Sequence, residues 1–445
     1  MILILSLAAM IVFIIASTTI GKLHPFVALL LAAFGFGVLT GMPVDELLTS
    51  INAGFGDTIA YIGIVIVAGS IIGTFLQRSG AAAHLAASVL RLAGARHIPT
   101  TMGLVGYVAS MPVFCDAGYV LLSPINRALS FRAGVSAAGG AVALSLGLYA
   151  THTMVPPTPG PVAAAGILDA DLGLVIVWGM IVSLFALGAG LLFAVRYAAK
   201  FELAAAPNDA AETKAAAPAG AHSVFAALLP IFVPILLIVG RSVAQLPGAP
   251  LGSDGFSGFM NVAGQPAVAL SIGAIFALFL PKSFERSMLS EHGWFGESIV
   301  KSALIILITG AGGAFGRVLQ SSGIADIVGS SASHIEMGLL LPFVLAAVIK
   351  TSQGSSTVAI VTTAGIVAPL LPSLGLGSET AKALAVVAIG AGSMVVSHAN
   401  DSYFWVVTQF SGMSVKQGYQ LQSLGTFIQG LAAVIVIVLL GMFVI

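Results

Sequence analysis

The stretch T-H-T-M-V-P-P-T-P-G-P, residues 151–161, places four prolines and a glycine inside an otherwise apolar region. Residues 136–150 before it and 162–168 after it carry no charge. A helix cannot continue through these prolines, because each lacks a backbone N–H and clashes with the preceding turn. The stretch therefore predicts a helix that breaks inside an apolar segment, which we expect to extend over about 134–168.

The composition indicates what surrounds this break. The chain has 445 residues, of which 58% are hydrophobic and only 8% are charged, whereas soluble domains are about one quarter charged. Apolar runs recur that are long enough to span a bilayer as helices, and we expect an all-α polytopic membrane protein. The expected spans are 3–20, 25–41, 58–76, 172–195, 223–243, 265–281, 298–316 and 424–445. The first is expected to be retained, because it lacks the basic flank of a signal peptide.

Charge and cysteine content exclude several classes of function. The formal net charge is zero, so there is no electrostatic case for nucleic acid binding. The single cysteine, Cys115, excludes an intramolecular disulfide and a cysteine-based metal cluster. We expect neither a cofactor nor a bound metal.

The two halves of the chain share a plan. The pattern Gly73-x-x-Leu76-Gln77-x-Ser79-Gly80 recurs as Gly316-x-x-Leu319-Gln320-x-Ser322-Gly323, and Thr151-His152 recurs as Ser397-His398, at offsets of 243 and 246 residues. Such a duplication is a known architecture of secondary transporters. We expect one membrane repeat over 1–200 and a second over 223–445. The Ala/Pro-rich segment 201–222 between them has the composition of a flexible soluble linker.

Each repeat is expected to hold a re-entrant hairpin, at about 98–132 and 337–372, followed by a broken helix, at about 134–168 and 383–410. With five crossings per half and the N-terminus outside, 13 of the 17 basic residues lie inside, as the positive-inside rule requires. The exceptions are Arg241, Arg317 and Lys382, which lie outside, and Lys350, which lies in a hairpin. An odd number of crossings inverts the second repeat, so that the hairpins can meet near the midplane. The linker then lies inside and both termini outside.

Polar clusters lie at membrane depth in these four segments. The hairpins read S-M-P-V-F-C-D-A-G at 110–118 and K-T-S-Q-G-S-S-T at 350–357, and the second broken helix reads S-H-A-N-D-S at 397–402. Irregular backbone at this depth is tolerated only where it is buried in protein or lines a wet cavity. Half-helix N-termini bind anions such as carboxylates. The clusters therefore predict a polar cage for a small, hydroxyl-rich anion.

The candidate substrate-binding residues are Asp116, Thr151, His152, Thr153, Lys350, Ser352, Gln353, Ser355, Ser356, Thr357, His398 and Asn400. The candidates for proton coupling are Asp116, His152 and Asp401, because an unpaired carboxylate is costly at this depth and histidine titrates near neutral pH. Structural alternatives stay open. Each aspartate could instead form a structural ion pair with Lys350 or a histidine, and each histidine could merely bond a backbone carbonyl. Lys350 could extend its ammonium from the base of the hairpin to the membrane surface. Cys115, Tyr149 and Trp405 are expected to be packing residues, and Arg317 and the 78–96 arginines interfacial anchors.

The chain resembles the gluconate permease family, the gluconate:proton symporters, within a wider ion-transporter superfamily. The motifs that carry the resemblance are V-F-C-D-A-G-Y-V-L-L-S-P-I at 113–125, A-T-H-T-M-V-P-P-T-P-G-P at 150–161, K-T-S-Q-G-S-S-T-V-A at 350–359 and S-H-A-N-D-S-Y-F-W at 397–405. The resemblance implies proton-driven uptake of gluconate, another sugar acid or a small hydroxy acid across the bacterial inner membrane, with a hydroxy amino acid in one branch. It also implies inverted repeats, an elevator-type movement and often a homodimer. The termini would then be periplasmic and the linker cytoplasmic.

The hypothesis for the mechanism places the substrate carboxylate against half-helix N-termini and hairpin hydroxyls, near Lys350 or a histidine. The sugar hydroxyls would meet Asn400, Thr151 and Gln353. One alternative is a sodium-coupled transporter of the same fold for a small carboxylate or hydroxy amino acid, with Na⁺ on the carbonyls of Gly354 and Ala399. Another is an intramembrane enzyme, but the polar clusters are duplicated and no H-E-x-x-H or G-x-S-x-G motif is present. A channel is a third, but there is no filter repeat.

Overall fold

The computed structural model describes residues 2–81, 84, 97–111, 114–203, 224–245, 255–323, 338–398 and 401–445. These residues form helices joined by turns and short extended segments, and no β-strand occurs among them. The expected linker, 201–222, lies almost entirely outside the described residues.

The helices follow one another in two similar series. The first comprises α1 (Ile2–Thr19), α2 (Pro25–Leu39), α3 (Val44–Arg78), α5 (Ile98–Ala109), α6 (Cys115–Ala133), α7 (Ala137–Met154), α8 (Pro159–Leu168), α9 (Leu172–Arg196) and the short η2 (Ala198–Lys200). The second comprises α10 (Val224–Ala244), α11 (Gly255–Ala263), α12 (Pro266–Ala277), η4 (Arg286–Leu289), α13 (Trp294–Ser321), α15 (Leu340–Gln353), α16 (Ser356–Val367), η5 (Ala368–Leu370), α17 (Glu379–Gly392), α18 (Ser402–Ser411), α19 (Val415–Gly418), η6 (Tyr419–Ser423) and α20 (Leu424–Val444).

The order of helices recurs along the chain. The bounds of α8 and α18 differ by 243 residues at both ends, and α3, α5 and α7 precede α13, α15 and α17 by nearly the same number. The residues expected to form hairpins form the pairs α5–α6 and α15–α16, and those expected to form broken helices form α7–α8 and α17–α18.

Several helices have the length and composition of membrane spans. Four described segments are long and apolar enough to cross a bilayer, and two bent helix pairs bring the number to as many as six. The four segments are Leu172–Lys200, Phe225–Ala244, Arg286–Ser321 and Val415–Val444. A span of about 20 apolar residues matches the hydrocarbon thickness of a bilayer. The chain is therefore an integral membrane protein.

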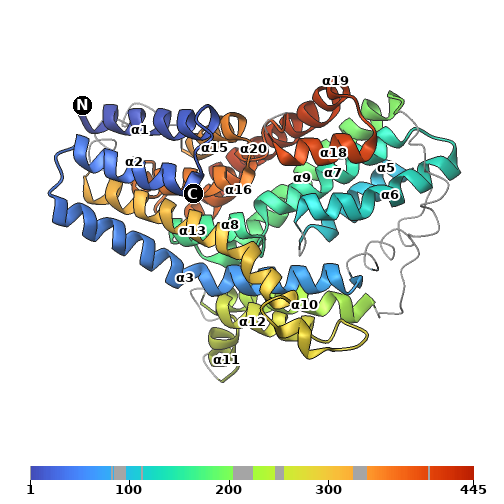
Figure 1. The fold of residues 1–445 in the computed structure, drawn as a ribbon, viewed down its shortest axis with the longest axis horizontal. Helices are drawn as coiled ribbons and strands as arrows, with labels where there is room; N and C mark the ends of the chain where they lie inside the picture. The colour runs from blue at the N-terminus through green and yellow to red at the C-terminus, as the bar shows by residue number, and fades with distance from the viewer. Residues whose placement is uncertain are drawn as a thin grey trace.

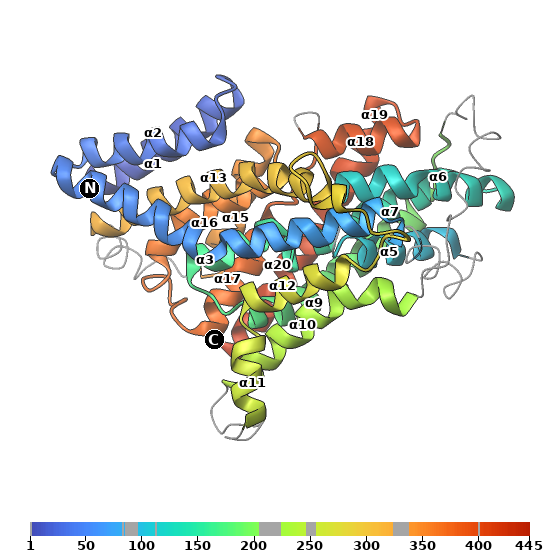
Figure 2. The same cartoon turned by 60° about the horizontal axis from the view of Figure 1, so that its bottom comes forward.

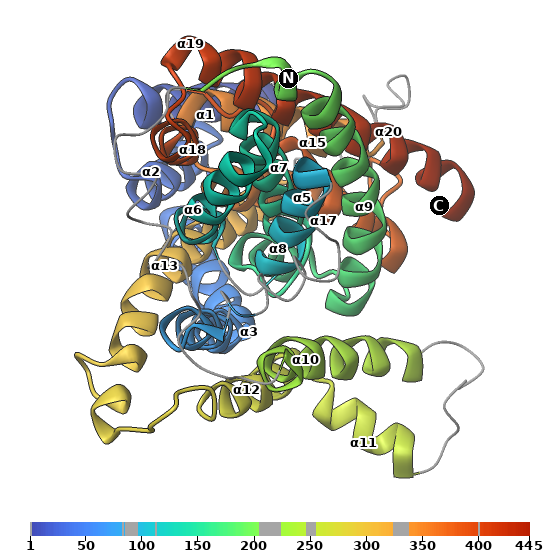
Figure 3. The same ribbon diagram turned by 90° about the vertical axis from the view of Figure 1, so that its right-hand side faces the viewer.

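Four helices, α7, α8, α16 and α17, occupy the interior of the bundle. Helices α1 and α2 lie at one end of the molecule and α5 and α6 at the other, while α3 and α13 pack side by side (Figures 1 and 2). Helices α10 to α12 form a flank that packs on α3 and α9 (Figure 3). The central helices α7, α8, α16 and α17 are buried on nearly all sides, as expected for helices that are apolar all round.

One expected span is shorter than the helix that contains it. The sequence predicts a span over 58–76, whereas α3 begins at Val44 and runs for 35 residues. Asp45 and Glu46 in its first turn, together with Asp57, end the apolar window. Acidic residues in a first turn favour the helix, because they lie at the positive end of its dipole. The charges that interrupt the hydropathy pattern therefore belong to the helix.

The proline-rich stretch forms the junction between α7 and α8. Helix α7 ends at Met154, Val155 is extended, and Thr158 is the extended N-cap of α8, with Pro159 at its first position. Proline is favoured there, because its missing N–H is not needed and its φ angle suits a helix. The Thr158 hydroxyl donates to the Val155 carbonyl at 2.7 Å. The break is thus an ordered turn between two buried helices.

Candidate functional site

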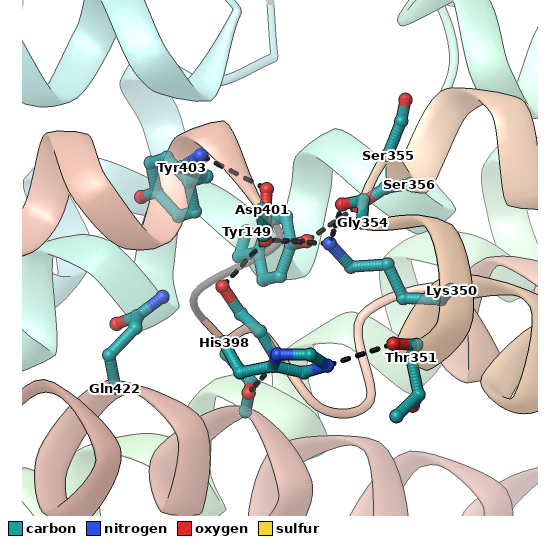
Figure 4. A network of polar contacts seen from close by, with 12 residues as sticks. Tyr149, Lys350, Thr351, Gly354, Ser355, Ser356, His398, Asp401, Tyr403 and Gln422 are labelled. Carbon is teal, nitrogen blue, oxygen red and sulfur yellow. Dashed lines mark hydrogen bonds and ion pairs between the residues drawn. The ribbon is translucent and has the colours of Figure 1, made fainter. Parts of the chain in front are cut away.

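A buried ion pair lies where the α15–α16 pair meets the break between α17 and α18. Lys350, in the last turn of α15, and Asp401, the N-cap of α18, approach to 2.6 Å between Nζ and Oδ2. The Lys350 side chain is fully buried, and that of Asp401 is 4% exposed. The ammonium also donates to the carbonyl of Gly354 (Figure 4). The pair therefore ties two interrupted segments of the second half together.

The Asp401 carboxylate is surrounded by donors. Its Oδ2 accepts from the Ser397 hydroxyl at 2.6 Å and lies 3.4 Å from the Tyr149 hydroxyl, which is oriented to donate. Its Oδ1 accepts from the backbone N–H of Tyr403 at 3.0 Å. A buried charge is tolerated when it is paired and its remaining lone pairs are hydrogen-bonded. Of the alternatives that the sequence leaves open for Asp401, an ion pair with Lys350 is the one observed.

Tyr149 belongs to this network, although the sequence suggests a packing residue. Its hydroxyl lies 2.5 Å from the Ser356 hydroxyl at the start of α16, and its ring lies 5.9 Å from the Lys350 ammonium. Figure 4 shows the phenol directed at Asp401 from a helix of the other half of the chain. A tyrosine in a helix of small apolar residues was the available signal, because a buried phenol needs a hydrogen-bond partner.

Helix N-termini converge around the pair. Asp401 caps α18, and the Ser355 side chain caps α16 by accepting from Val358 N at 3.4 Å. Helix α8 begins beside α16, since a Cβ on Gly160 would approach the Ile360 side chain to 2.7 Å. Helix α6 carries Asp116 in its first turn. Each N-terminus adds partial positive charge and unpaired N–H groups, which suit a carboxylate ligand.

Asp116 is the second carboxylate of the cluster. It is close enough to interact electrostatically with both Asp401 and Lys350. Its Oδ1 is buried and has no hydrogen-bond partner in the part of the chain described, and its Oδ2 lies 4.0 Å from the Cys115 thiol, which is oriented to donate. One ammonium therefore faces two carboxylates, so a proton on Asp116 would bring the cluster to neutrality.

His152 and His398 occupy matching positions but have different surroundings. His398 places Nε2 2.8 Å from the Thr351 carbonyl, so it bridges α15 and the α17–α18 break. His152 is 7% exposed, and its Nδ1 lacks a partner within the described residues. It lines a cavity of about 20 Å³ with Ser70, whose hydroxyl likewise has no described partner. A polar cavity of this size can hold one water molecule, so His152 retains hydrogen-bonding capacity.

The remaining candidates divide into three groups. Thr151 donates to the Tyr107 carbonyl at 3.0 Å and Thr153 to the Tyr149 carbonyl at 3.1 Å, so both hydroxyl protons are used within the fold. Thr357 is half-buried beside Ser356 at the start of α16. The side chains of Ser352 and Gln353, and Asn400 as a whole, lie outside the described residues.

The carbonyl of Gly354 also bears on the sodium alternative. It accepts from the Lys350 ammonium, so a cation already occupies the direction in which Na⁺ would bind. Ala399, the other expected sodium ligand, lies outside the described residues. Within the described residues, no cluster of three His, Cys, Asp or Glu side chains could hold a metal ion.

Replacing Tyr149 by phenylalanine is expected to raise the KM for transport and to lower stability by about 1 kcal/mol, the usual value of one hydrogen bond. The ring packing stays, but Ser356 and Asp401 lose the hydroxyl. Substrate titration of uptake and thermal unfolding measure the two effects. Tyr107→Phe is the matched control, because its hydroxyl bonds Ser183 at 2.8 Å, away from the cluster. A normal KM for Tyr149→Phe would assign Tyr149 to packing alone.

Comparison with known proteins identifies the family. The model of the GntP family permease matches residues 1–443. The gluconate permeases of Pseudomonas aeruginosa and Zymomonas mobilis are 34% and 30% identical, over 95% and 98% of this chain and 93% and 96% of theirs. The D-serine transporter DsdX of Escherichia coli is 32% identical over 93% of this chain and 92% of its own.

A solved structure agrees with the fold. The YdaH transporter of Alcanivorax borkumensis, described as having an unusual topology, superposes with a TM-score of 0.69 over 95% of this chain and 99% of that one. At 17% identity the likeness concerns the fold alone. The predicted resemblance to gluconate permeases is confirmed by the family match and by the relatives. These relatives are transporters and not enzymes, and the protein belongs to the GntP permease family.

Proposed function

We propose that this permease takes up gluconate or a related small sugar acid by proton symport across the bacterial inner membrane. The observation that carries the proposal is the excess carboxylate of the buried cluster, in which Lys350 and Asp401 pair and Asp116 remains without a cation of its own. A small anionic substrate is in keeping with the family and with its gluconate permeases.

The charge balance supports coupling to protons. The Lys350–Asp401 pair is neutral as a unit, so an ionised Asp116 leaves the site with one negative charge. An anionic substrate would add a second, and crossing the bilayer with such a charge is costly. A proton on Asp116 removes one charge and lets the two anions share the site. Asp401 is less suited to carry the proton, because its oxygens are already engaged. His152, with its unpartnered Nδ1, is the alternative carrier.

The substrate carboxylate would lie against the N-termini of α8 and α16, close to Lys350. The hydroxyl groups of the substrate would contact Ser355, Thr357 and His398, which are all partly exposed. A hydroxy amino acid is the second candidate, because the D-serine transporter DsdX is nearly as similar as the gluconate permeases.

The proposal includes two inverted repeats and an elevator movement of the half-helix pairs against α3 and α13. It also includes a homodimer with both termini in the periplasm and the 201–222 linker in the cytoplasm. The recurrence of helices at about 243 residues supports the repeats. A Cβ on Gly316 would lie 2.9 Å from the Gly365 carbonyl, so α13 and α16 meet through backbone. Small residues permit such close approach in membranes, which suits helices that slide past each other.

Gradient-driven uptake into proteoliposomes tests the coupling. With an inwardly directed proton gradient and no sodium, radiolabelled gluconate is expected to accumulate, and a protonophore is expected to abolish accumulation. Unlabelled glycerate, uronates and D-serine then compete in separate arms to define the substrate. Accumulation driven by a sodium gradient at symmetrical pH would overturn proton coupling in favour of the sodium alternative.

A further inference from the structure

We propose a second binding site, distinct from the Lys350–Asp401 cluster, for a small carboxylate that also carries hydrogen-bond donors. It is a cavity of about 550 Å³ between α3, α13, the end of α8 and the start of α17. Small-ligand sites typically occupy about 300–1,000 Å³. The inference rests on the proposed function for the identity of the ligand, which is gluconate or a molecule of its chemical class.

Arg317 supplies the carboxylate-binding group of this cavity. Its side chain is exposed into the cavity, and a guanidinium N–H donates to the Gln320 side chain at 3.3 Å. It forms none of the ion pairs found within the described residues. A guanidinium presents several donors in a planar fork that matches a carboxylate. Arg317 therefore has unused donors directed at a cavity of suitable size.

Asp57 supplies the complementary acceptor. It lines the same cavity from α3, with an exposed side chain that forms no ion pair within the described residues. Close helix packing places it near Arg317, because a Cβ on Gly54 would lie 2.6 Å from both Arg317 Cβ and the Gly313 carbonyl. Asp57 and Arg317 follow these glycines by one turn. Opposite charges thus face one space without neutralising each other, and a ligand with a carboxylate and hydroxyls can satisfy both.

Lys382 has a different part in this cavity. Its ammonium donates to the Asp169 carbonyl at 3.2 Å and pairs with Glu379 at 3.0 Å. It therefore joins the end of α8 to the start of α17, at the C-terminal end of the α8 dipole, where a cation is stabilising. Its donors are largely used, so Arg317 is the cation available to a ligand.

The cavity is connected to the central cluster by two helices. Helix α16 begins at the cluster and α8 begins beside His152, and both end at the cavity, where Leu168 and Ala368 form part of its wall. At about 1.5 Å per residue, the two sites are roughly 15–18 Å apart. Arg317 and Lys382 are also exceptions to the positive-inside pattern. This pattern fits a capture site on the face from which the substrate arrives, in place of the anchoring expected for Arg317.

Equilibrium binding of radiolabelled gluconate to the purified full-length protein tests the second site. The wild type is expected to bind two equivalents per chain, and Arg317→Gln only one. Arg317→Gln should also raise the KM for uptake roughly tenfold, equivalent to about 1.4 kcal/mol of binding free energy. Arg78→Gln is the matched control, since Arg78 is an exposed arginine paired with Glu297 at 2.7 Å, outside the cavity. A parallel binding measurement with D-serine shows whether the ammonium of this ligand can take the place of the sugar-acid hydroxyls as the partner of Asp57.

Asp57→Asn tests the second site independently if Arg317→Gln does not fold. It is expected to weaken gluconate binding at this second site. One equivalent in the wild type, or two in both variants, would overturn the second site. Failure of the proposed function looks different, because wild-type proteoliposomes would then not accumulate gluconate under a proton gradient.

Discussion

Replacing Lys350 by methionine is expected to abolish transport and to destabilise the protein by about 3–5 kcal/mol. The substitution leaves the Asp401 carboxylate, 4% exposed, without its cation. Removing one partner of a buried ion pair is costly because the other charge stays desolvated. The Gly354 carbonyl loses its donor as well. Thermal unfolding in detergent and uptake by proteoliposomes measure the two losses separately.

The double variant Lys350→Met/Asp401→Asn separates a functional role from a structural one. Neutral replacement of both partners of a buried pair is often nearly neutral for stability, so most of the unfolding temperature is expected to return. Transport is expected to stay absent, because no ammonium remains in the cluster to hold an anionic substrate. A double variant that transports at the wild-type rate would assign the pair to structure alone.

Replacing Asp116 by asparagine is expected to abolish proton-driven accumulation while leaving substrate exchange across the membrane. The amide resembles the protonated acid, so the variant behaves as a carrier whose proton never dissociates. The Lys350–Asp401 pair is left intact, and binding should persist. Accumulation under a proton gradient and counterflow of labelled gluconate in the same vesicles make the comparison.

Two further variants give this experiment its controls. Glu46→Gln removes an exposed carboxylate in the first turn of α3 and is expected to accumulate substrate normally. His152→Gln tests the alternative carrier, because it removes the titratable ring beside Ser70. Full accumulation by Asp116→Asn together with loss in His152→Gln would transfer the coupling role to the histidine.

Local chemistry explains why the sequence predicts much of the architecture. Apolar runs long enough to span a bilayer indicate a membrane protein, and the prolines at 151–161 interrupt a helix through the backbone alone. Both can be predicted without knowing which distant residues pack nearby. The hydropathy pattern does not predict the start of α3 at Val44, because the acidic residues of its first turn have the hydropathy of a loop. Helix boundaries also depend on caps and dipoles.

The sequence predicts which residues belong to the candidate site but not which of them interact. Lys350, Asp116 and His152 follow from polar groups at membrane depth, where every such group needs an explanation. The sequence suggests a packing role for Tyr149, yet its hydroxyl bonds Ser356, which is 207 residues away in sequence. No periodicity encodes a contact of that separation.

The amino-acid sequence is sufficient to predict a helical membrane protein with interrupted helices that carry polar clusters. These properties follow from composition, proline and local motifs, each of which acts over a few residues. The pairing of Lys350 with Asp401, the different surroundings of His152 and His398, and the position of Arg317 at a cavity depend on the folded structure. The physical reason is that hydrogen bonds and ion pairs form within about 3 Å, and only the packing of distant helices brings their partners that close.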